Sequence, residues 1–391
     1  MKYNFDHKLS RENSSCVKYD LRKVVFGNEN VLPMWVADMD IPTPDFILNA
    51  ITSRCKHPVL GYSFRDKEYH QAIVQWQQKR HGWVIDPEWI SFCPGVVAGI
   101  NHIINALTEP ADRIIIQPPV YHPFFSTVRN NGRELLLNPL LENNGYYQID
   151  FANLEELFKT GAKMLILSSP HNPVGRVWNK DELIKLGDLC LQYNVLVISD
   201  EIHSDLVFKP NIHHPFASLK KEYEAITITL GAPSKTFNTA GLSTGYVIIP
   251  DALLLKKYNA ILESTGAGLG NVFGIEALKS AYSPKGEEWL EELLIYLQHN
   301  IDIVGSYLKS NLPDIRFHFP EGTYMIWLDF RKLQISEQEL NKKLIETAGL
   351  GFNSGSQFGS EGTGFQRMNI ACPKSLVEEA MHRMRKTFIA S

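Results

Sequence analysis

The sequence has few cysteines, and they are neither paired nor clustered. The five cysteines are odd in number, and none of them forms a C-x-x-C motif. A disulfide framework or a cysteine-ligated zinc site needs paired, closely spaced cysteines, so this pattern argues against both. It is typical of reduced thiols, and we therefore expect a cytoplasmic protein without a bound metal. The cysteines are Cys16, Cys55, Cys93, Cys190 and Cys372.

The sequence also lacks a surplus of positive charge and any long apolar segment. It has 39 Lys and Arg against 43 Asp and Glu, a net charge of −4, so nothing in the charge balance points to nucleic acid. Apolar runs such as residues 252–255 are far too short to cross a bilayer. The first residues, M-K-Y-N-F-D-H-K-L-S-R-E, lack the apolar centre of a signal peptide. We therefore expect neither a nucleic-acid partner nor a membrane partner.

What the sequence does contain is the composition of an ordinary globular enzyme. Of its 391 residues, 44% are hydrophobic and 21% are charged. This length predicts two domains, or one large domain with a smaller one. Residues 1–44 are rich in turn formers and predict an irregular arm, which a helical pattern follows from Pro44 to Cys55.

From Trp89 onward, short apolar runs alternate with helical patterns. This alternation predicts β-α-β units and an α/β fold with a buried, mostly parallel sheet of seven strands. The predicted strands are Ile90–Cys93, Arg113–Ile116, Glu134–Leu137, Met164–Leu167, Val195–Ser199, Ile226–Leu230 and Tyr246–Ile249. The predicted helices between them are Val96–Leu107, Asn153–Thr160 and Lys180–Tyr193.

The C-terminal part follows a different pattern. Residues 287–310 have leucine and isoleucine at i, i+3 and i+4 spacing, which predicts a long amphipathic helix. This helix is expected to lead from the sheet into a smaller α+β domain. We therefore expect a large domain over residues 45–284 and a small domain over residues 285–391. The elements expected near the C-terminus are a strand over 324–328 and helices over 336–348 and 374–387.

The residues that follow each predicted strand are the candidates for function, because ligands of open α/β sheets bind beyond the carboxyl ends of the strands. Gly95 opens a helix after the first strand, and free backbone N–H groups at such a helix start can bind a phosphate. Lys235 follows the sixth strand in the stretch T-L-G-A-P-S-K-T-F-N, with no carboxylate beside it in the sequence. The residues that follow the other strands are Tyr121, Asn172, Asp200 and His203.

Each of these residues has an ordinary structural explanation when taken alone. Most lysines are solvated, an aromatic ring can pack a loop, and an asparagine can hydrogen-bond its own turn. Taken together, they form the set that pyridoxal 5′-phosphate needs: a lysine amine, a carboxylate for the ring nitrogen, an amide donor and an aromatic face. We therefore expect pyridoxal 5′-phosphate as the cofactor.

The order of these motifs resembles the fold-type I pyridoxal-phosphate enzymes over nearly the whole chain. The motifs are Gly95-Val-Val, Tyr121, Asn172-Pro-x-Gly, Asp200-Glu-Ile-His and Ser234-Lys-x-Phe-Asn-x-Ala-Gly. M-W-V-A-D-M-D (34–40), P-E-G-T-Y-M-I-W-L-D (320–329) and R-M-N-I-A-C-P (367–373) are similar to motifs of the MalY/PatB group of cystathionine β-lyases. The resemblance implies a large α/β domain and a smaller α+β domain made from both chain ends, so that the arm, residues 1–44, joins residues 285–391.

The resemblance also implies a role for each matching residue. Lys235 is expected to form the Schiff base and to act as base at Cα, and Arg367 to bind the α-carboxylate of an amino-acid substrate through two parallel hydrogen bonds. Tyr62 resembles a tyrosine that reaches the phosphate of the neighbouring subunit, which implies a homodimer with shared active sites. Tyr121 is expected to stack on the ring and to help the thiolate leave. The other expected contacts are Asp200 to the ring nitrogen, Asn172 to the phenolic oxygen, Ile202 on the second ring face, Val96, Val97 and Ser234 at the phosphate, His203 near the cofactor, and Ala37 at the substrate.

Two positions depart from the pattern of many aminotransferases of this fold. Those enzymes have an arginine eight residues after the lysine, where this chain has Ser243, and a phosphate-binding serine where it has Ala232. The MalY/PatB group also lacks that arginine. Ser243 therefore favours a C–S β-lyase that cleaves cystathionine or related cysteine S-conjugates to a thiol, pyruvate and ammonia. An aminotransferase is the alternative, a racemase side activity is chemically open, and a non-catalytic regulatory protein is a remote alternative.

Two further motifs predict no additional site. G-A-G-L-G-N, residues 266–271, follows a helical pattern and has its third glycine misplaced for a dinucleotide fingerprint. His213 and His214 lie in a loop bounded by prolines, and no neighbouring residue in the sequence completes a metal site.

Overall fold

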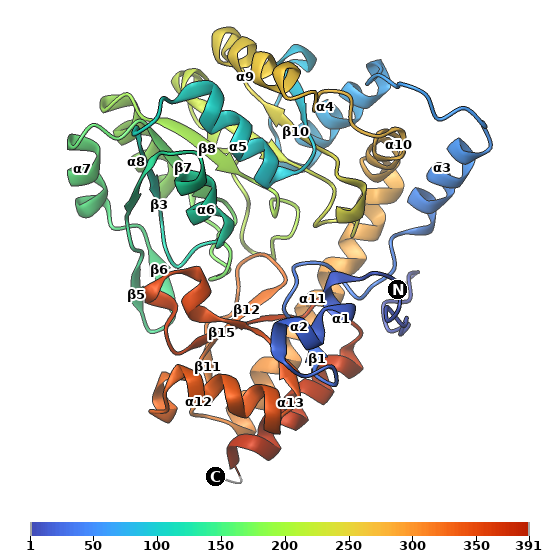
Figure 1. Cartoon of the computed structure of the whole chain (residues 1–391), viewed down its shortest axis with the longest axis vertical. Coiled ribbons are helices and arrows are strands. Elements are labelled where there is room, and N and C mark those ends of the chain that lie inside the picture. The colour runs from blue at the N-terminus through green and yellow to red at the C-terminus, as the bar shows by residue number, and fades with distance from the viewer. Residues whose placement is uncertain (1, 390–391) are drawn as a thin grey trace.

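A seven-stranded sheet lies at the centre of the larger part of the molecule (Figure 1). The computed structural model describes residues 2–389, and within them this sheet has the order β2-β10-β9-β8-β7-β3-β4. All neighbouring strands pair in parallel except β10, which is antiparallel to both of its neighbours. The predicted fold class is therefore confirmed. The strands are β2 (Ile90–Cys93), β3 (Arg113–Ile116), β4 (Glu134–Leu137), β7 (Met164–Ser168), β8 (Leu196–Asp200), β9 (Thr227–Gly231) and β10 (Gly245–Ile248).

The orientation of β10 follows from the connection that precedes it. A loop from Ala232 to Thr244, with one short 3₁₀ turn but no crossover helix, joins β9 to β10. Parallel neighbours need a long crossover, whereas a chain that turns back directly can only pair antiparallel. Lys235 lies in this returning loop, which keeps its backbone close to the end of β9.

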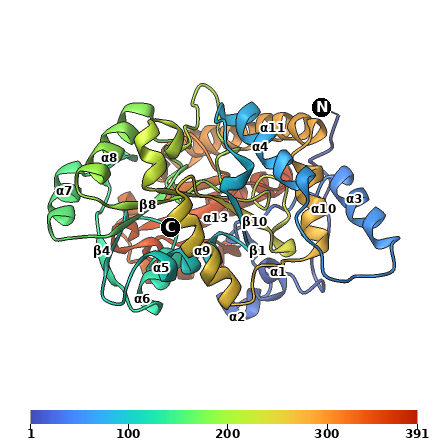
Figure 2. The ribbon, with the colours of Figure 1, turned by 90° about the horizontal axis from the view of Figure 1, so that it is seen from above.

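Helices cover both faces of the sheet, as Figure 2 shows, with α5, α6 and α9 on one side and α7 and α8 on the other. Alternate strand residues point to opposite faces: Ile114 and Ile116 pack with α5, α6 and α9, whereas Ile115 packs with α7 and α8. These side chains are fully buried, so the sheet core is apolar on both faces. The helices are α5 (Val96–Leu107), α6 (Pro123–Asn130), α7 (Phe151–Lys159), α8 (Lys180–Gln192) and α9 (Ala252–Ser264).

Local capping residues fix where several helices begin. Asn179 accepts a hydrogen bond from the backbone N–H of Glu182, and the Glu182 carboxylate accepts one from the backbone of Asn179, which forms a capping box at α8. The Asp66 side chain caps α4 (Lys67–His81) by accepting from the backbone N–H of Tyr69, and Asn271 caps α10 (Val272–Ala281) by accepting from that of Gly274. Alpha4 and α10 were not predicted from the sequence; α10 packs against α4 and against α3 (Asp45–Cys55).

A second, smaller sheet lies below the first in Figure 1 and is antiparallel throughout, in the order β11-β12-β15-β14. The long helix predicted to lead into it is α11 (Pro284–Asn311), and the helix predicted over 336–348 forms as α12 (Glu337–Lys342) and a π-helical turn (Lys343–Thr347). In the sequence, every strand of the large sheet comes before residue 284 and every strand of this smaller sheet comes after it. This order supports our proposed division into a large domain, residues 45–284, and a small domain, residues 1–44 plus 285–391. The strands and last helix are β11 (Arg316–Phe317), β12 (Met325–Asp329), β14 (Asn353–Ser354), β15 (Phe365–Asn369) and α13 (Lys374–Ile389).

The N-terminal arm is more regular than its composition predicts, so the expectation of an irregular arm was wrong in part. It contains two short helices, α1 (Val17–Asp20) and α2 (Arg22–Phe26), and the strand β1 (Leu32–Pro33). Beta1 pairs in parallel with β13 (Leu350–Gly351), which joins the arm to the C-terminal part of the chain. A separate hairpin is formed by β5 (Leu141–Asn143) and β6 (Tyr146–Gln148). Across residues 2–389, no helix combines the length and apolar character needed to cross a membrane.

Candidate active site

The predicted site residues follow strands that end at one edge of the large sheet. Beta8 ends at Asp200, β7 ends at Ser168 shortly before Asn172, and β9 ends at Gly231 shortly before Lys235. Carboxyl ends of parallel strands lie at the same edge, so these side chains converge although they are far apart in the sequence.

A cavity of about 290 Å³ opens at this edge of the sheet. It is lined by the loops that follow β2, β7, β8 and β9, and by one residue of the N-terminal arm. Ten of the twelve predicted site residues line this cavity, and Arg367 and Tyr62 do not. The ten are Ala37, Val96, Val97, Tyr121, Asn172, Asp200, Ile202, His203, Ser234 and Lys235.

The Lys235 side chain is partly buried, and its amine donates a hydrogen bond to the backbone carbonyl of Ala37 at 2.6 Å. Burial, and then the positive charge of Arg367, lowers the pKa of Lys235 from 10.5 to about 8. The carboxylates of Asp38 and Asp200 act in the opposite direction. A lysine with such a pKa loses its proton near neutral pH, which a nucleophilic amine requires.

Asp200 is the buried carboxylate of the cavity. Its side chain accepts a hydrogen bond from the backbone N–H of Ile202 at 3.2 Å, and it forms no ion pair with any residue that the structure describes. Burial raises the pKa of Asp200 from 3.8 to about 7, and the Lys235 cation reduces this rise. Ionisation of such a buried carboxyl group is costly when the group is alone. It becomes favourable once a cation lies against the carboxylate.

The N-terminus of α5 provides a site for an anion. Its cap residue is Gly95, which has a φ of 147° and no side chain to accept hydrogen bonds from the first turn. The N–H groups of Val96 and Val97 therefore stay available, and the helix dipole favours negative charge there. The hydroxyls of Ser234 and Thr244 line the same cavity.

Arg367 is a buried cation without a carboxylate partner among residues 2–389. It lies on β15 and is 2% exposed. Its guanidinium donates to Asn172 Oδ1 at 3.1 Å, to the Trp35 carbonyl at 2.7 Å and to Asn353 Oδ1 at 2.7 Å. Its Nε has no hydrogen-bond partner within the described chain. An arginine left in this state is ready to bind an anionic ligand.

The cavity fits pyridoxal 5′-phosphate on these observations. It places an amine of lowered pKa, a buried carboxyl group without a cation of its own, and a helix N-terminus with hydroxyls around one space. Each group is left without a full partner inside the protein, and each matches one part of the cofactor: the aldehyde, the ring nitrogen and the phosphate.

Two aromatic residues predicted to lie near the cofactor, Tyr121 and His203, line this cavity. Tyr121 lines the cavity and packs edge to face against Phe124, with ring centres 5.9 Å apart. Burial raises the pKa of Tyr121, so its hydroxyl stays protonated and can donate. His203 is buried, and burial together with the Lys235 cation keeps its pKa well below 6.5. His203 is therefore neutral in this site.

Tyr62 is the one predicted residue that the single chain leaves far from the cavity. Its side chain is 96% exposed, on the loop between α3 and α4 that projects from the body of the molecule at the upper right of Figure 1. Its expected contact needs a second subunit, and that part of the prediction stays a prediction.

Several residues of the site were missed by sequence reasoning. Ser168 and Thr244 line the cavity, and Ser243, noted only as a departure, lines it too. Their place just after or just before a strand at the same sheet edge was an available signal. Tyr324 donates a hydrogen bond to the Ala37 carbonyl at 3.0 Å, and Asn353 accepts one from Arg367; no local pattern marks either residue.

His213, which was considered only as a metal ligand, has another role. It is buried, and its Nε2 lies 2.9 Å from the carboxylate of Glu201, the residue that follows Asp200. Glu201 also accepts hydrogen bonds from Ser199 at 2.8 Å and from the backbone of Phe216 at 3.0 Å. This buried pair fixes the chain behind Asp200.

Comparison with known proteins identifies the family. Residues 37–384 match the model for aminotransferase class I and II. The chain is 42% identical to cystathionine beta-lyase PatB of Bacillus subtilis, over 98% of this chain and 99% of that protein. It is 32% identical to the protein MalY of Escherichia coli, over 97% of each chain. The crystal structure of cystalysin from Treponema denticola, which contains pyridoxal 5′-phosphate, superimposes with a TM-score of 0.97 at 36% identity and covers 100% of both chains. The chain belongs to the aminotransferase class I and II family and, within it, to the group that contains PatB and MalY.

Proposed function

We propose that this protein is a pyridoxal-phosphate-dependent carbon–sulfur β-lyase. It cleaves cystathionine or related cysteine S-conjugates to a thiol, pyruvate and ammonia. The observation that carries the proposal is one cavity holding Lys235 and Asp200, in a chain that is 42% identical to a cystathionine beta-lyase along its whole length.

The bound cofactor supplies an electron sink that stabilises a carbanion at the Cα atom of an amino acid. Asp200, as a carboxylate, would hold the proton on the ring nitrogen of the cofactor, and Asn172 would donate to its phenolic oxygen. Lys235 would hold the cofactor through its amine, and the same amine would take the proton from Cα of the substrate as a general base. The pKa of about 8 that burial gives Lys235 suits a base that works near neutral pH.

Arg367 acts on the substrate, and Tyr121, which is also proposed to stack on the cofactor ring, acts on the substrate as well. The guanidinium of Arg367 binds the α-carboxylate and fixes the orientation of the Cα–H bond, because its planar fork matches a carboxylate with two parallel hydrogen bonds. The protonated hydroxyl of Tyr121 gives a proton to the sulfur as the Cβ–S bond breaks. The thiol leaves, and water converts the remaining fragment to pyruvate and ammonia.

Release of pyruvate and thiol from L-cystathionine tests this function directly. The purified protein, loaded with pyridoxal 5′-phosphate and given no keto acid, is expected to release pyruvate and homocysteine in equal amounts over many turnovers. Amino transfer that appears only after a keto acid is added would replace the lyase with an aminotransferase and leave the cofactor site intact. If neither pyruvate release nor amino transfer is detected, with S-alkyl cysteines also tested as substrates, both activities are contradicted.

The loop between α3 and α4 supports a homodimer. Four of its apolar side chains are largely exposed: Val59 (61%), Leu60 (60%), Tyr62 (96%) and Phe64 (79%). Such a cluster on a projecting loop is typical of a surface that another chain covers. The base of the loop is anchored, because Arg65 donates hydrogen bonds to the backbone at Gly268 and Leu269. We propose that this loop enters a second copy of the chain and brings Tyr62 to the cofactor phosphate there.

Replacing Tyr62 with phenylalanine is expected to weaken cofactor binding about tenfold, because one hydrogen bond to a charged phosphate is lost. The dimer is expected to persist, since the apolar contact of the ring is kept. Cofactor affinity measured by quenching of tryptophan fluorescence, with light scattering for molecular mass, checks both points. A monomeric wild-type protein would contradict the shared site.

We also propose that the protein is cytoplasmic. All five cysteines are free, and three of them, Cys93, Cys190 and Cys372, are buried as thiols. Burial raises the pKa of each of these three thiols, which keeps them unreactive. Free thiols are typical of a reducing compartment.

A further inference from the structure

Residues 35–41, which we call the strap, contact both chemically important side chains through backbone carbonyls. The carbonyl of Ala37 accepts a hydrogen bond from the Lys235 amine at 2.6 Å, and the carbonyl of Trp35 accepts one from Arg367 at 2.7 Å. The strap itself belongs to no helix and to no strand. Its position over the cavity therefore depends on contacts from other segments.

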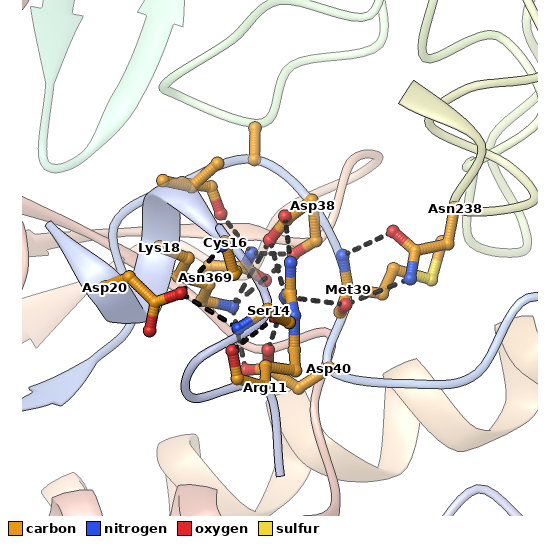
Figure 3. Close-up of polar contacts among 12 residues, drawn as sticks. Arg11, Ser14, Cys16, Lys18, Asp20, Asp38, Met39, Asp40, Asn238 and Asn369 are labelled. Carbon is orange, nitrogen blue, oxygen red and sulfur yellow. Dashed lines mark hydrogen bonds and ion pairs between the residues drawn. The ribbon is translucent and has the colours of Figure 1, made fainter. Parts of the chain in front are cut away.

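Two asparagines fix the strap backbone from the segments that carry the lysine and the arginine. Asn238, on the Lys235 loop, accepts from the backbone N–H of Met39 at 3.0 Å and donates to its carbonyl at 3.0 Å (Figure 3). Asn369, on β15 close to Arg367, donates to the carbonyl of Asp38 at 2.6 Å. The strap is thus held by the Lys235 loop and by β15. Its remaining side, which we call the outer side, contacts the N-terminal arm.

On that outer side, the two aspartates of the strap meet two cations of the arm, as Figure 3 shows. Arg11 donates to both carboxylate oxygens of Asp38, at 3.0 and 2.5 Å, and to Asp40 at 2.7 Å. Lys18, which is 1% exposed, donates to Asp40 at 2.8 Å. Lys18 also lies 3.7 Å from Asp38. Two negative and two positive charges are thus balanced in a partly buried cluster, and removing either cation leaves one negative charge in excess.

The balance matters because Asp38 lies close enough to Lys235 to affect its charge. The charged and titratable groups around Lys235 are Arg367, Asp38, Asp200, His203 and Tyr324, whose hydroxyl donates to the same Ala37 carbonyl as the lysine. Arg367 favours the neutral amine, whereas Asp38 and Asp200 favour the protonated one. Asp38 is the member of this set that has cations of its own in the N-terminal arm: Arg11 at 2.5 Å and Lys18 at 3.7 Å.

We propose that Arg11 is a positioning residue for Lys235: it holds the strap so that the Ala37 carbonyl faces the amine, and it neutralises the Asp38 carboxylate beside that amine. The proposal rests on the proposed function only in giving Lys235 a chemical role. The arm of the chain thereby sets both the place and the basicity of the amine. The aspartates of M-W-V-A-D-M-D, which the proposed chemistry leaves without a role, are the groups through which it acts.

The test measures the basicity of the Lys235 amine in the full-length chain freed of cofactor. The rate of reductive methylation of Lys235, followed by mass spectrometry across a pH series, gives its pKa without any assay of turnover. In Arg11→Gln the pKa of Lys235 is expected to rise by about half a pH unit or more, because Asp38 loses its close ion pair with Arg11 and keeps only Lys18, at 3.7 Å. In Arg11→Gln/Asp38→Asn this rise is expected to disappear.

Arg22→Gln is the matched control, because Arg22 lies in the same arm and pairs with Glu12 rather than with the strap. It is expected to leave the pKa of Lys235 within about 0.2 units of the wild-type value. Equal values in wild type and Arg11→Gln would overturn the proposal, as would equal shifts in Arg11→Gln and Arg22→Gln. If Arg11→Gln fails to fold, Asp38→Asn alone decides: a lower pKa of Lys235 supports the proposal, and an unchanged one overturns it. A failure of the lyase assay would leave this result intact, so the two proposals fail separately.

Discussion

Turnover of a cysteine S-conjugate falls by at least about 10³-fold when Lys235 is replaced with alanine, because the chain then loses both the attachment point of the cofactor and the base at Cα. The amine has no substitute nearby, since the other polar side chains that line the cavity carry hydroxyls, a neutral imidazole, an amide and a carboxyl group. The visible absorbance of the lysine-bound cofactor is expected to disappear as well. Pyruvate release and a spectrum of the purified variant measure both effects.

Two variants separate this prediction from a general loss of structure. Lys235→Arg keeps a positive charge but cannot attach the cofactor, so it is expected to be as inactive as the alanine variant. Lys257→Ala removes an exposed lysine on α9 and is expected to behave as wild type. A normal visible spectrum in Lys235→Ala would remove this residue from its assigned role.

Replacing Asp200 with asparagine is expected to lower turnover about 10³-fold while making the cofactor-free protein more stable. Activity falls because an amide cannot hold a proton on the ring nitrogen by charge. Stability rises because the folded protein buries this carboxyl group at a cost: its pKa is raised by burial from 3.8 to about 7. Asparagine has nearly the same shape and keeps the hydrogen bond from Ile202 without a charge.

The sign of the pH dependence follows from the raised pKa. The folded protein binds the Asp200 proton more tightly than the unfolded chain, so this group stabilises the fold most below about pH 4 and loses that contribution as the pH rises through about 7. The rise of about three pH units sets an upper bound of about 4 kcal/mol, at about 1.4 kcal/mol per unit. The wild-type melting temperature is therefore expected to drop between about pH 5 and pH 8 by more than that of Asp200→Asn.

The matched control for Asp200→Asn is Asp181→Asn, which changes an exposed carboxylate in the first turn of α8. That variant is expected to leave activity unchanged and to give no gain in stability. A cofactor-free Asp200→Asn protein that melts below wild type at about pH 8 would contradict the raised pKa. Full activity in that variant would contradict the role of Asp200 at the ring nitrogen.

The sequence was sufficient for the large sheet, and ten of the twelve site residues predicted from it line one cavity. Each predicted strand is present within a residue or two of its expected bounds, because buried strands are short apolar runs that stand out from the surrounding helical patterns. Asp200 and Lys235 could be predicted because the end of a strand is visible in the sequence and ligands bind there. Arg367 came from the family resemblance, since nothing local distinguishes it from any other strand arginine.

What could not be predicted depends on contacts between distant segments. Arg11 looks like one of many charged residues in a polar arm, and only the fold places it against Asp38, 27 positions later. The same is true of Asn353, whose amide oxygen is fixed on Arg367 by the pairing of β14 with β15. Pairwise geometry of this kind leaves no periodic or local trace in a single sequence.

The order of the site residues along the chain has a consequence for how the enzyme is made. The groups that fit the cofactor lie between Val96 and Thr244, whereas the only buried arginine assigned to the substrate, among residues 2–389, is Arg367 on β15. A growing polypeptide therefore completes its cofactor half well before its substrate half has left the ribosome. A truncated protein that ends before residue 367 and still folds is therefore expected to bind pyridoxal 5′-phosphate but not the amino-acid substrate.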